Sequence, residues 1–580
     1  MASVCGRGCG LPGGHGLTLP TPPCDHSGMS PHPPVIAGSV GAVMMRFVAL
    51  VAALLALAGC QRSANPRPVT AAAAQTQFIE RHRPQFHFTP PAKWMNDPNG
   101  MVFFEGEYHL FYQHYPDSTV WGPMHWGHAV STDLVHWQHL PIALFPDSLG
   151  LIFSGSAVID WKNTSGFGVN GKPPMVAMFT YHDMAAEKRG TQTFQTQGLA
   201  YSNDRGRTWT KYAGNPVIPN TGIRDFRDTK VIWHEASQRW IMVLAAGDRI
   251  RLYASYDLTQ WESASEFGVN VGAHGGVWEC PDLFPIRIEG TNETRWVLLV
   301  SINPGGPNGG SATQYFVGNF DGTTFSLDPQ FATGLGTAGK EPARGIWVDH
   351  GRDDYAGVTW SDIPSTDGRR LYIGWMSNWD YATVVPTDAW RSAMTVPRAL
   401  TLRRTPAGLR LFSTPVSELR LLRGETRTLT AQRISGTVPL RLPSGGTAAQ
   451  SEIDLEFLVS PNDTTDVAVE LSNAAGETYR IGFDQASGRY YSDRTALPRS
   501  FSAKFATAVH WAPRIVTDSV VRMHLFFDRA SAELFGDGGA TALTDIMFPT
   551  EDFSTIRLVV KGDAVRLRYA NISALVSMWR

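Results

Sequence analysis

The amino-acid sequence predicts an all-β protein in which a β-propeller is followed by a β-sandwich. Short apolar or alternating runs of strand length are separated by Gly, Asp, Asn and Pro, and no long stretch keeps a helical period. One Asp-containing segment recurs at blade-sized intervals of roughly 50–70 residues. Beyond about Pro406 the runs alternate more cleanly, as the half-buried strands of a sandwich do.

The propeller is expected over residues 83–405. Its repeated segment is an Asp-containing turn followed by an aromatic residue, which we interpret as a hairpin with an inward ring. Because a propeller brings one strand of every blade to a central axis, residues far apart in sequence converge in one funnel. The repeats lie at 131–137, 202–209, 255–261 and 319–325, and clear strands at 101–104, 108–113, 175–180, 240–246, 296–302 and 371–376.

The sandwich is expected over residues 406–580. Its alternating runs lie at 452–457, 522–527 and 556–560, and tryptophan becomes scarce there. We interpret this part as a second domain with a supporting or accessory sugar-binding role.

The first 82 residues are interpreted as an upstream extension, a signal peptide and a tether. Residues 1–43 are rich in Gly and Pro and are expected to be an upstream extension, and residues 44–60 form a signal peptide with a short apolar run. That run ends in Leu-Ala-Gly-Cys60, which resembles the bacterial lipoprotein signal, so Cys60 is the expected lipidation site. Gln61 then points to the outer membrane, and a periplasmic or secreted protein is the alternative. Residues 61–82 are expected to be a tether.

Composition narrows the function. A net charge of −2 does not point to nucleic acid, whose partners usually carry a clear basic patch, and it is compatible with a neutral substrate such as a sugar. Of the 18 tryptophans, about two thirds are expected in the core and the rest at a sugar site. Only Cys280 lies beyond the signal peptide, so no intramolecular disulfide is expected.

Three acidic motifs can carry chemistry. Asp97 lies in Asn-Asp-Pro-Asn-Gly, a strong turn that can also hold a carboxylate at a funnel mouth. Asp228 follows Arg227, either as a surface ion pair or as a carboxylate kept ionised to hold sugar hydroxyls. Glu279 lies between a tryptophan and a cysteine, and such an apolar setting raises the pKa of a carboxyl and suits a general acid. The alternative for Glu279 is a strand-edge residue facing water.

Taken in order, these motifs resemble those of glycoside hydrolase family 32, the invertases, inulinases and levanases. The resemblance extends to 108–113, 121–128, 153–156, 374–379 and 534–539, so it covers nearly all of the chain after about residue 83. It implies a five-bladed propeller plus a β-sandwich. One departure is Thr229, where the family usually has proline; the carboxylate of Asp228 remains, but its direction is less firmly set.

The resemblance also implies residue roles. Asp97 matches the nucleophile, Glu279 the acid/base and Asp228 the transition-state stabiliser. The positions that match the fructose pocket are Asn96, Gln113, Trp121, Phe153, Ser154, Arg227 and, less closely, Trp375.

The implied reaction is retaining, with the two catalytic carboxyls about 5–5.5 Å apart and a covalent fructosyl-enzyme between the steps. Arg227 and Asn96 are expected to favour the charged form of the carboxylates they contact, whereas apolar neighbours keep Glu279 neutral. This scheme needs no cofactor and no metal. Four histidines cluster in the sequence, His125, His128, His136 and His139, but they lack the accompanying ligands of a zinc site.

Two Gly-rich loops, 268–276 and 303–310, resemble those of exo-acting levanases and inulinases. We therefore expect release of terminal fructose from levan or inulin, with sucrose as a side substrate. The alternatives are a dedicated sucrose invertase and a non-catalytic fructan-binding lipoprotein that feeds a transporter. An endo-acting enzyme or a fructosyltransferase fits less well.

Overall fold

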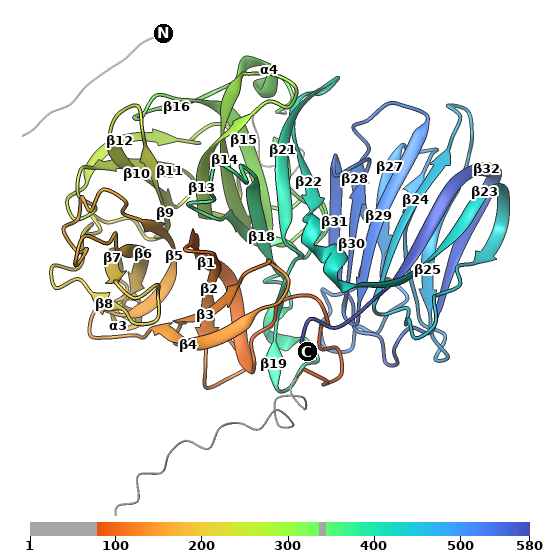
Figure 1. The fold of residues 1–580 in the computed structure, drawn as a ribbon, viewed down its shortest axis with the longest axis horizontal. Coiled ribbons are helices and arrows are strands. Elements are labelled where there is room, and N and C mark those ends of the chain that lie inside the picture. Colours follow the sequence, from red (N-terminus) through yellow and green to blue (C-terminus); the bar gives the residue numbers. More distant parts are fainter. Residues whose placement is uncertain (1–77, 336–343, 580) are drawn as a thin grey trace, which may run out of the picture. The chain divides into compact units, whose positions relative to one another are not determined.

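The computed structural model describes residues 78–335 and 344–579, and it confirms the predicted fold class. Five antiparallel sheets form the blades of a propeller, and a β-sandwich follows (Figure 1). The predicted strands in both domains all fall within observed strands. No helix in the described part of the chain is long and apolar enough to cross a bilayer.

Each blade has four main strands, numbered from the innermost outward. Blade one contains β1 (Lys93–Phe104), β2 (Glu107–Tyr115), β3 (His125–Ser131) and β4 (Gln138–Leu144). Blade two contains β5 (Leu151–Ile159), β6 (Met175–His182), β7 (Gln195–Ser202) and β8 (Thr210–Lys211). Blade three contains β9 (Phe226–His234), β10 (Arg239–Ala246), β11 (Ile250–Ser255) and β12 (Glu262–Phe267).

Blade four contains β13 (Val277–Arg287), β14 (Thr294–Asn303), β15 (Ala312–Phe320) and β16 (Phe325–Leu327), and α4 (Pro329–Ala332) follows it. Blade five contains β17 (Tyr355–Thr359), β18 (Arg370–Met376), β21 (Arg398–Thr405) and β22 (Gly408–Pro415). Between β18 and β21, η2 (Ala382–Val384) precedes β19 (Trp390–Arg391), which pairs with β1, and β20 (Ala393–Met394), which pairs with β18. The domain border expected at 405/406 therefore falls inside the β21–β22 hairpin of the fifth blade.

The repeated Asp segment is the turn between the third and fourth strands of a blade, in blades one to four. In the first copy the Oδ1 atom of Asp133 accepts hydrogen bonds from the backbone N–H groups of Val135 and His136, at 3.0 and 2.8 Å. The indole N–H of Trp137 then donates to the carbonyl of Leu134. Trp209 and Trp261 make the equivalent bond in their blades, so the repeat marks a turn built from side-chain caps.

A β-bulge interrupts each innermost strand near its first residues. In β5, β9, β13 and β17 two residues lie opposite one residue of the neighbouring strand. The extra residues include Asp228, Cys280 and Ala356, which all have a positive φ of 46–69°. Bulges redirect side chains and are frequent beside active sites. They turn one end of the innermost strands into a place where consecutive side chains can face the channel.

The sandwich has ten strands linked into one hydrogen-bonded set. The long β32 (Thr555–Leu575) pairs with β25 through its first residues and with β24 through its last, so it belongs to both layers. The strands are β23 (Arg423–Pro439), β24 (Ser451–Leu458), β25 (Asp466–Ser472), β26 (Thr478–Asp484), β27 (Arg489–Asp493), β28 (His510–Pro513), β29 (Val520–Asp528), β30 (Ser531–Gly536), β31 (Thr541–Ile546) and β32; η3 (Ser417–Leu422) precedes them.

Buried charges connect the two domains. The guanidinium of Arg398 on β21 donates to Asp354 at 3.0 Å and to Glu533 of the sandwich at 2.5 Å. His87 lies between Glu533 and Asp528, with each of its ring nitrogens 2.8 Å from a carboxylate oxygen. All five side chains are buried, so each charge needs its partner.

Residues 78–82, which we expected in the tether, are part of the folded body. Phe78 is buried and its ring stacks on Trp579 with centroids 4.0 Å apart. The guanidinium of Arg83 lies over the same ring at 4.9 Å. These contacts exclude residues 78–82 from a tether. Residues 1–77, which include the expected signal peptide and Cys60, lie outside the described residues.

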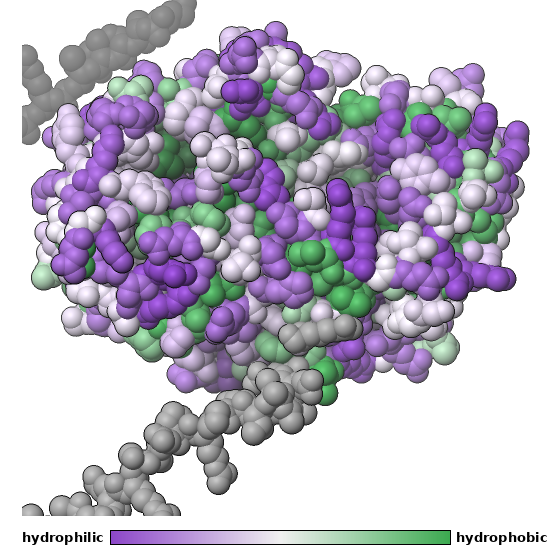
Figure 2. All heavy atoms as spheres, in the orientation of Figure 1, coloured by the Kyte–Doolittle hydropathy of each residue, from purple (hydrophilic) through white to green (hydrophobic). Residues whose placement is uncertain are grey.

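On the face shown in Figure 2, polar side chains surround small apolar patches, because most apolar side chains lie in the cores.

Candidate active site

A cavity of ≈ 400 Å³ opens where the innermost strands begin. It brings together residues from the first four blades. Blade five contributes Trp379, which follows β18, the second strand of that blade. The lining residues are Asn96, Asp97, Gln113, Trp121, Phe153, Ser154, His182, Glu187, Phe194, Gln195, Asp225, Arg227, Asp228, Glu279 and Trp379. All three predicted catalytic carboxyls, from β1, β9 and β13, are among them.

Asp97 lies at a bulge of β1, where the register shifts between Asn96 and Pro98. Its Oδ2 atom accepts a hydrogen bond from the Ser154 hydroxyl at 2.8 Å and contacts the Cys280 thiol at 3.7 Å. Its Oδ1 atom is buried and accepts no hydrogen bond from the described residues. Burial raises the pKa of Asp97, hydrogen bonds from Asn96 and Ser154 oppose this, and the charge of Glu279 adds to it. Ser154 thus holds one oxygen of Asp97, and the carboxyl group as a whole lines the cavity.

Asp228 lies at the bulge of β9 with a φ of 69°. Its backbone N–H donates to the Thr180 hydroxyl at 3.0 Å, and its Oδ2 atom accepts from the Cys280 backbone N–H at 3.2 Å. Burial raises the pKa of Asp228 to about 7 against the nearby charge of Arg227, and the charges of Glu279 and Asp97 add to the rise. The bulge and these two bonds set the direction of the carboxyl, although Thr229 replaces the expected proline.

Glu279 is held by polar groups on both of its oxygens. Arg227 donates to Oε1 from Nε at 3.0 Å and from Nη2 at 2.8 Å. The hydroxyl of Tyr355 donates to Oε2. The apolar setting expected from the sequence neighbours is therefore wrong. Trp278 points into the blade core, where its indole N–H donates to the carbonyl of Ala273 at 3.0 Å.

The predicted fructose-pocket residues all line the cavity except one. Phe153 stacks on His182 at 4.2 Å and meets Trp121 edge-on at 5.9 Å. Trp375 does not line the cavity. It is fully buried behind Trp379, with ring centroids 4.9 Å apart, because β18 turns its side chain into the packing between blades.

Sequence reasoning missed several lining residues. Glu187 comes from α3 (Met184–Lys188), a short helix capped by Asp183, and it hydrogen-bonds His182 at 3.1 Å. Asp225 accepts a hydrogen bond from Arg227 at 2.7 Å. Trp379 lies in segment 374–379, which the resemblance covers, but of that segment only Trp375 is expected in the pocket. The remaining new members are His182, Phe194 and Gln195, which belong to no motif recognised in the sequence.

The other sequence features lie away from the cavity. His128 packs on Phe111 at 4.0 Å and bonds His109, and His139 lies among aromatic rings. Within residues 78–335 and 344–579, no three His, Cys, Asp or Glu side chains form a metal-ligating group. Neither Gly-rich loop, 268–276 or 303–310, contributes a lining residue.

A propeller joined to a sandwich, with three carboxyls and several aromatic rings around one cavity, defines an enzyme of the glycoside hydrolase class. The family models agree. Residues 87–415 match the N-terminal domain of glycosyl hydrolases family 32, and residues 418–575 match the C-terminal domain. The chain belongs to glycosyl hydrolase family 32.

Individual members of the family are similar to this chain over most of its length. The chain is 46% identical over 510 residues to a levanase of Bacillus subtilis, covering 88% of this chain and 72% of the levanase. It is 39% identical over 532 residues to an extracellular exo-inulinase of Aspergillus awamori, covering 87% and 96%. The crystal structure of an A. awamori exo-inulinase aligns with a TM-score of 0.78 at 37% identity, over 87% of this chain and all of that one. A β-fructofuranosidase from Schwanniomyces occidentalis, complexed with fructosyl-erythritol, aligns with a TM-score of 0.75 at 32% identity over 87% of this chain and 99% of that one.

Proposed function

We propose that this protein is a retaining exo-β-fructosidase that releases terminal β-D-fructofuranosyl residues from fructans such as levan and inulin, and also cleaves sucrose. The observation that carries the proposal is the placement of Asp97 and Glu279 in one cavity, where the Ser154 hydroxyl holds one oxygen of Asp97. A levanase and exo-inulinases among the relatives support the substrate class.

In the first step, a carboxylate oxygen of Asp97 attacks C2 of the terminal fructosyl unit. The bond from C2 to the leaving oxygen breaks, and Glu279 gives its proton to that oxygen. In the second step, Glu279 takes a proton from water, the water oxygen bonds to C2, and Asp97 is released. Two inversions leave the product with the original β configuration.

Asp228 is proposed to accept hydrogen bonds from fructose hydroxyls that strengthen as positive charge develops on the ring. Its bulged backbone supports this role, because the carboxyl is set by Thr180 and Cys280 before substrate arrives. Asn96, Gln113, Trp121, Phe153, Ser154 and Arg227 are proposed to complete the fructose pocket.

Leaving-group dependence separates the two catalytic roles. Asp97→Asn should abolish turnover of every substrate, since the covalent step is lost. Glu279→Gln should lose nearly all turnover of sucrose and inulin but retain the first step on an aryl β-fructofuranoside, whose leaving group needs no proton. With methanol as acceptor, the wild-type product should be the methyl β-fructofuranoside. An α product, or wild-type turnover of sucrose or inulin by either variant, contradicts the assignment.

Product analysis over time tests the substrate class. The purified chain is incubated with sucrose, inulin and levan. Free fructose as the sole early product from inulin or levan supports exo action. Cleavage of sucrose alone indicates a dedicated invertase, mixed oligomers indicate endo action, and binding without fructose release indicates a fructan-binding lipoprotein.

We also propose that the protein is exported and anchored by a lipid on Cys60 to the bacterial outer membrane. The support is the sequence up to Leu-Ala-Gly-Cys60 and the extracellular relatives. Mass spectrometry of the mature protein should find a lipid-modified amino terminus at Cys60, which Cys60→Ser removes. An unmodified terminus instead indicates a periplasmic or secreted form.

A further inference from the structure

A second cavity, of ≈ 480 Å³, lies at the other end of the innermost strands. The catalytic pocket uses residues near the start of these strands, such as Ser154 on β5 and Asp228 on β9. The second cavity uses residues near their ends, such as Ile159 on β5 and Trp233 on β9. A strand advances about 3.3 Å per residue, and Trp233 follows Asp228 by five residues on β9. The two sites are therefore roughly 17 Å apart along the channel.

Lys230 separates the two cavities. Its Nζ atom donates to the carbonyl of Thr359 at 2.6 Å and lies 3.3 Å from Oδ1 of Asp282. All three residues are buried and come from three different innermost strands or their ends. The channel is therefore filled by protein at this level, and the second cavity is a separate site.

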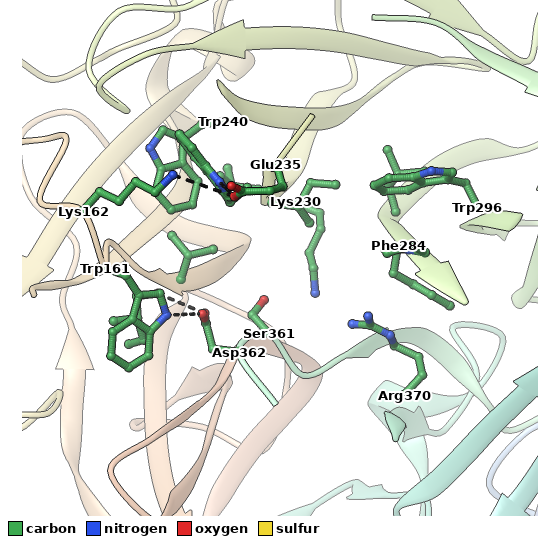
Figure 3. Close-up of a pocket in the computed structure, with 17 residues that line it drawn as sticks. Trp161, Lys162, Lys230, Glu235, Trp240, Phe284, Trp296, Ser361, Asp362 and Arg370 are labelled. Carbon is green, nitrogen blue, oxygen red and sulfur yellow. Dashed lines mark hydrogen bonds and ion pairs between the residues drawn. The ribbon is translucent and has the colours of Figure 1, made fainter. Parts of the chain in front are cut away.

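An exposed tryptophan stands at the second cavity in a fixed orientation. Trp161 has 61% of its surface exposed, which is unusual because tryptophan side chains are mostly buried. Its indole N–H donates to Oδ1 of Asp362 at 2.8 Å, and its ring meets Phe104 edge-on at 5.7 Å. Figure 3 shows this hydrogen bond and, across the cavity, Trp296 and Phe284. A rigid exposed indole offers a flat face to the C–H groups of a sugar ring.

Two polar groups of this cavity have no hydrogen-bonding partner among the described residues. The guanidinium of Arg370 makes no hydrogen bond or ion pair there, and it lies over the Phe284 ring at 4.8 Å. The hydroxyl of Ser361 is buried without a partner. Figure 3 shows Arg370 and Ser361 at the cavity, on either side of the end of Lys230, which is already paired with Asp282. Unused polar groups that converge in an aromatic cavity indicate a polar ligand.

The charges favour a neutral ligand over an anion. Lys162 forms an ion pair with Glu235 at 3.8 Å, and Lys230 is paired with Asp282. Arg370 remains, and the carboxylate of Asp362 lines the same cavity. Cations and carboxylates thus balance, whereas an anion site would need an excess of positive charge.

We propose that this cavity is a second saccharide-binding site, which takes a neutral sugar ring stacked on Trp161 and hydrogen-bonded by Arg370, Ser361 and Asp362. Its volume of ≈ 480 Å³ is at least that of the catalytic pocket, ≈ 400 Å³, so it has room for one sugar ring. On a polymeric substrate such a site would hold a second chain segment far from the reacting end and raise the local substrate concentration.

Binding is tested in the Glu279→Gln protein, so that no result depends on hydrolysis. The indole N–H signal of Trp161, assigned by its loss in Trp161→Phe, is followed by NMR during titration with millimolar β-2,1- and β-2,6-linked fructo-oligosaccharides and with malto- and cello-oligosaccharides. At least one should shift this signal with saturation. Arg370→Gln should weaken that binding about tenfold, the effect expected from one good contact. Tyr256→Ala, at a similarly exposed aromatic residue (69%), should leave it unchanged.

Kinetics supply the second measurement. Trp161→Ala should raise KM for inulin or levan several-fold while kcat for sucrose stays at the wild-type value, because the catalytic pocket is untouched. If no saccharide shifts the Trp161 signal, the proposal is wrong even if the enzyme hydrolyses fructans. If inorganic sulfate shifts it and saccharides do not, the cavity is an anion site and the proposal is likewise overturned.

Discussion

Arg227 donates two hydrogen bonds to a single oxygen of Glu279, at 3.0 and 2.8 Å. The other oxygen accepts from the hydroxyl of Tyr355. Blades three and five therefore hold a carboxylate that belongs to blade four. For the proposed acid/base role, a carboxyl group held on both oxygens needs little reorganisation during the reaction.

Tyr355→Phe is expected to lower kcat for sucrose about 10- to 100-fold with a smaller change in KM, because Glu279 loses the donor that sets its direction. Steady-state kinetics measure both constants. Tyr372→Phe is the matched control, since it removes an equally buried hydroxyl that donates to Asp354 at 2.9 Å, outside the cavity. Equal losses of kcat in the two variants would mean that only stability is affected.

Ser154→Ala is expected to move the acidic limb of the kcat/KM profile to higher pH. The Ser154 hydroxyl bonds the ionised form of Asp97 and so opposes the rise that burial causes in its pKa. Without that bond the pKa of Asp97 rises further, and less nucleophile is ionised at a given acidic pH. Ser156→Ala is the control, because that hydroxyl accepts from the Val231 backbone N–H at 2.9 Å instead. An unmoved limb in Ser154→Ala contradicts the prediction.

His87 should make folding stability depend on alkaline pH. Burial alone lowers the pKa of His87, but hydrogen bonds and charges from Asp528 and Glu533 raise it to about 9. A raised pKa in the folded state stabilises the protein fully below the unfolded value of about 6.5, and this contribution disappears as pH rises through about 9.

The wild type should therefore lose on the order of 3 kcal/mol between these pH values from this residue. Thermal unfolding of His87→Gln should show a lower Tm at pH 6 and a smaller fall towards pH 9.5 than the wild type. The exposed His136→Gln serves as control. Parallel Tm profiles for wild type and His87→Gln would rule out the linkage.

Thr229→Val is expected to stabilise the fold by about 1 kcal/mol. The Thr229 hydroxyl is buried and has no hydrogen-bond partner among the described residues, and valine has the same shape without a polar atom. Thr180→Val should have the opposite sign, because the Thr180 hydroxyl bonds both the Asp228 backbone N–H and Gln197. Thermal unfolding should give a higher Tm for Thr229→Val and a lower Tm for Thr180→Val than for the wild type. A lower Tm for Thr229→Val would contradict the prediction.

Local patterns carried much of the prediction. Features that depend only on neighbouring residues can be predicted from the sequence. They include the Asp-containing turns, the alternating strands and the order of the acidic motifs. The three carboxyls lie in one cavity because each falls near the start of an innermost strand. The prediction was wrong where neighbours in sequence were taken as neighbours in space. The residues beside Glu279 suggested an apolar setting, and Trp375 was expected at the pocket that Trp379 lines.

By itself, the sequence determined the class of fold, the family and the residues able to carry the chemistry, since these follow from short periodicities and ordered motifs. Only the tertiary structure decided what each carboxyl touches. The bulges of the innermost strands turn Asp97, Asp228 and Glu279 towards one point, and residues from other blades, such as Arg227 and Tyr355, supply their partners. The same closure of blades produced the second cavity at Trp161, because its walls come from segments that share no sequence pattern.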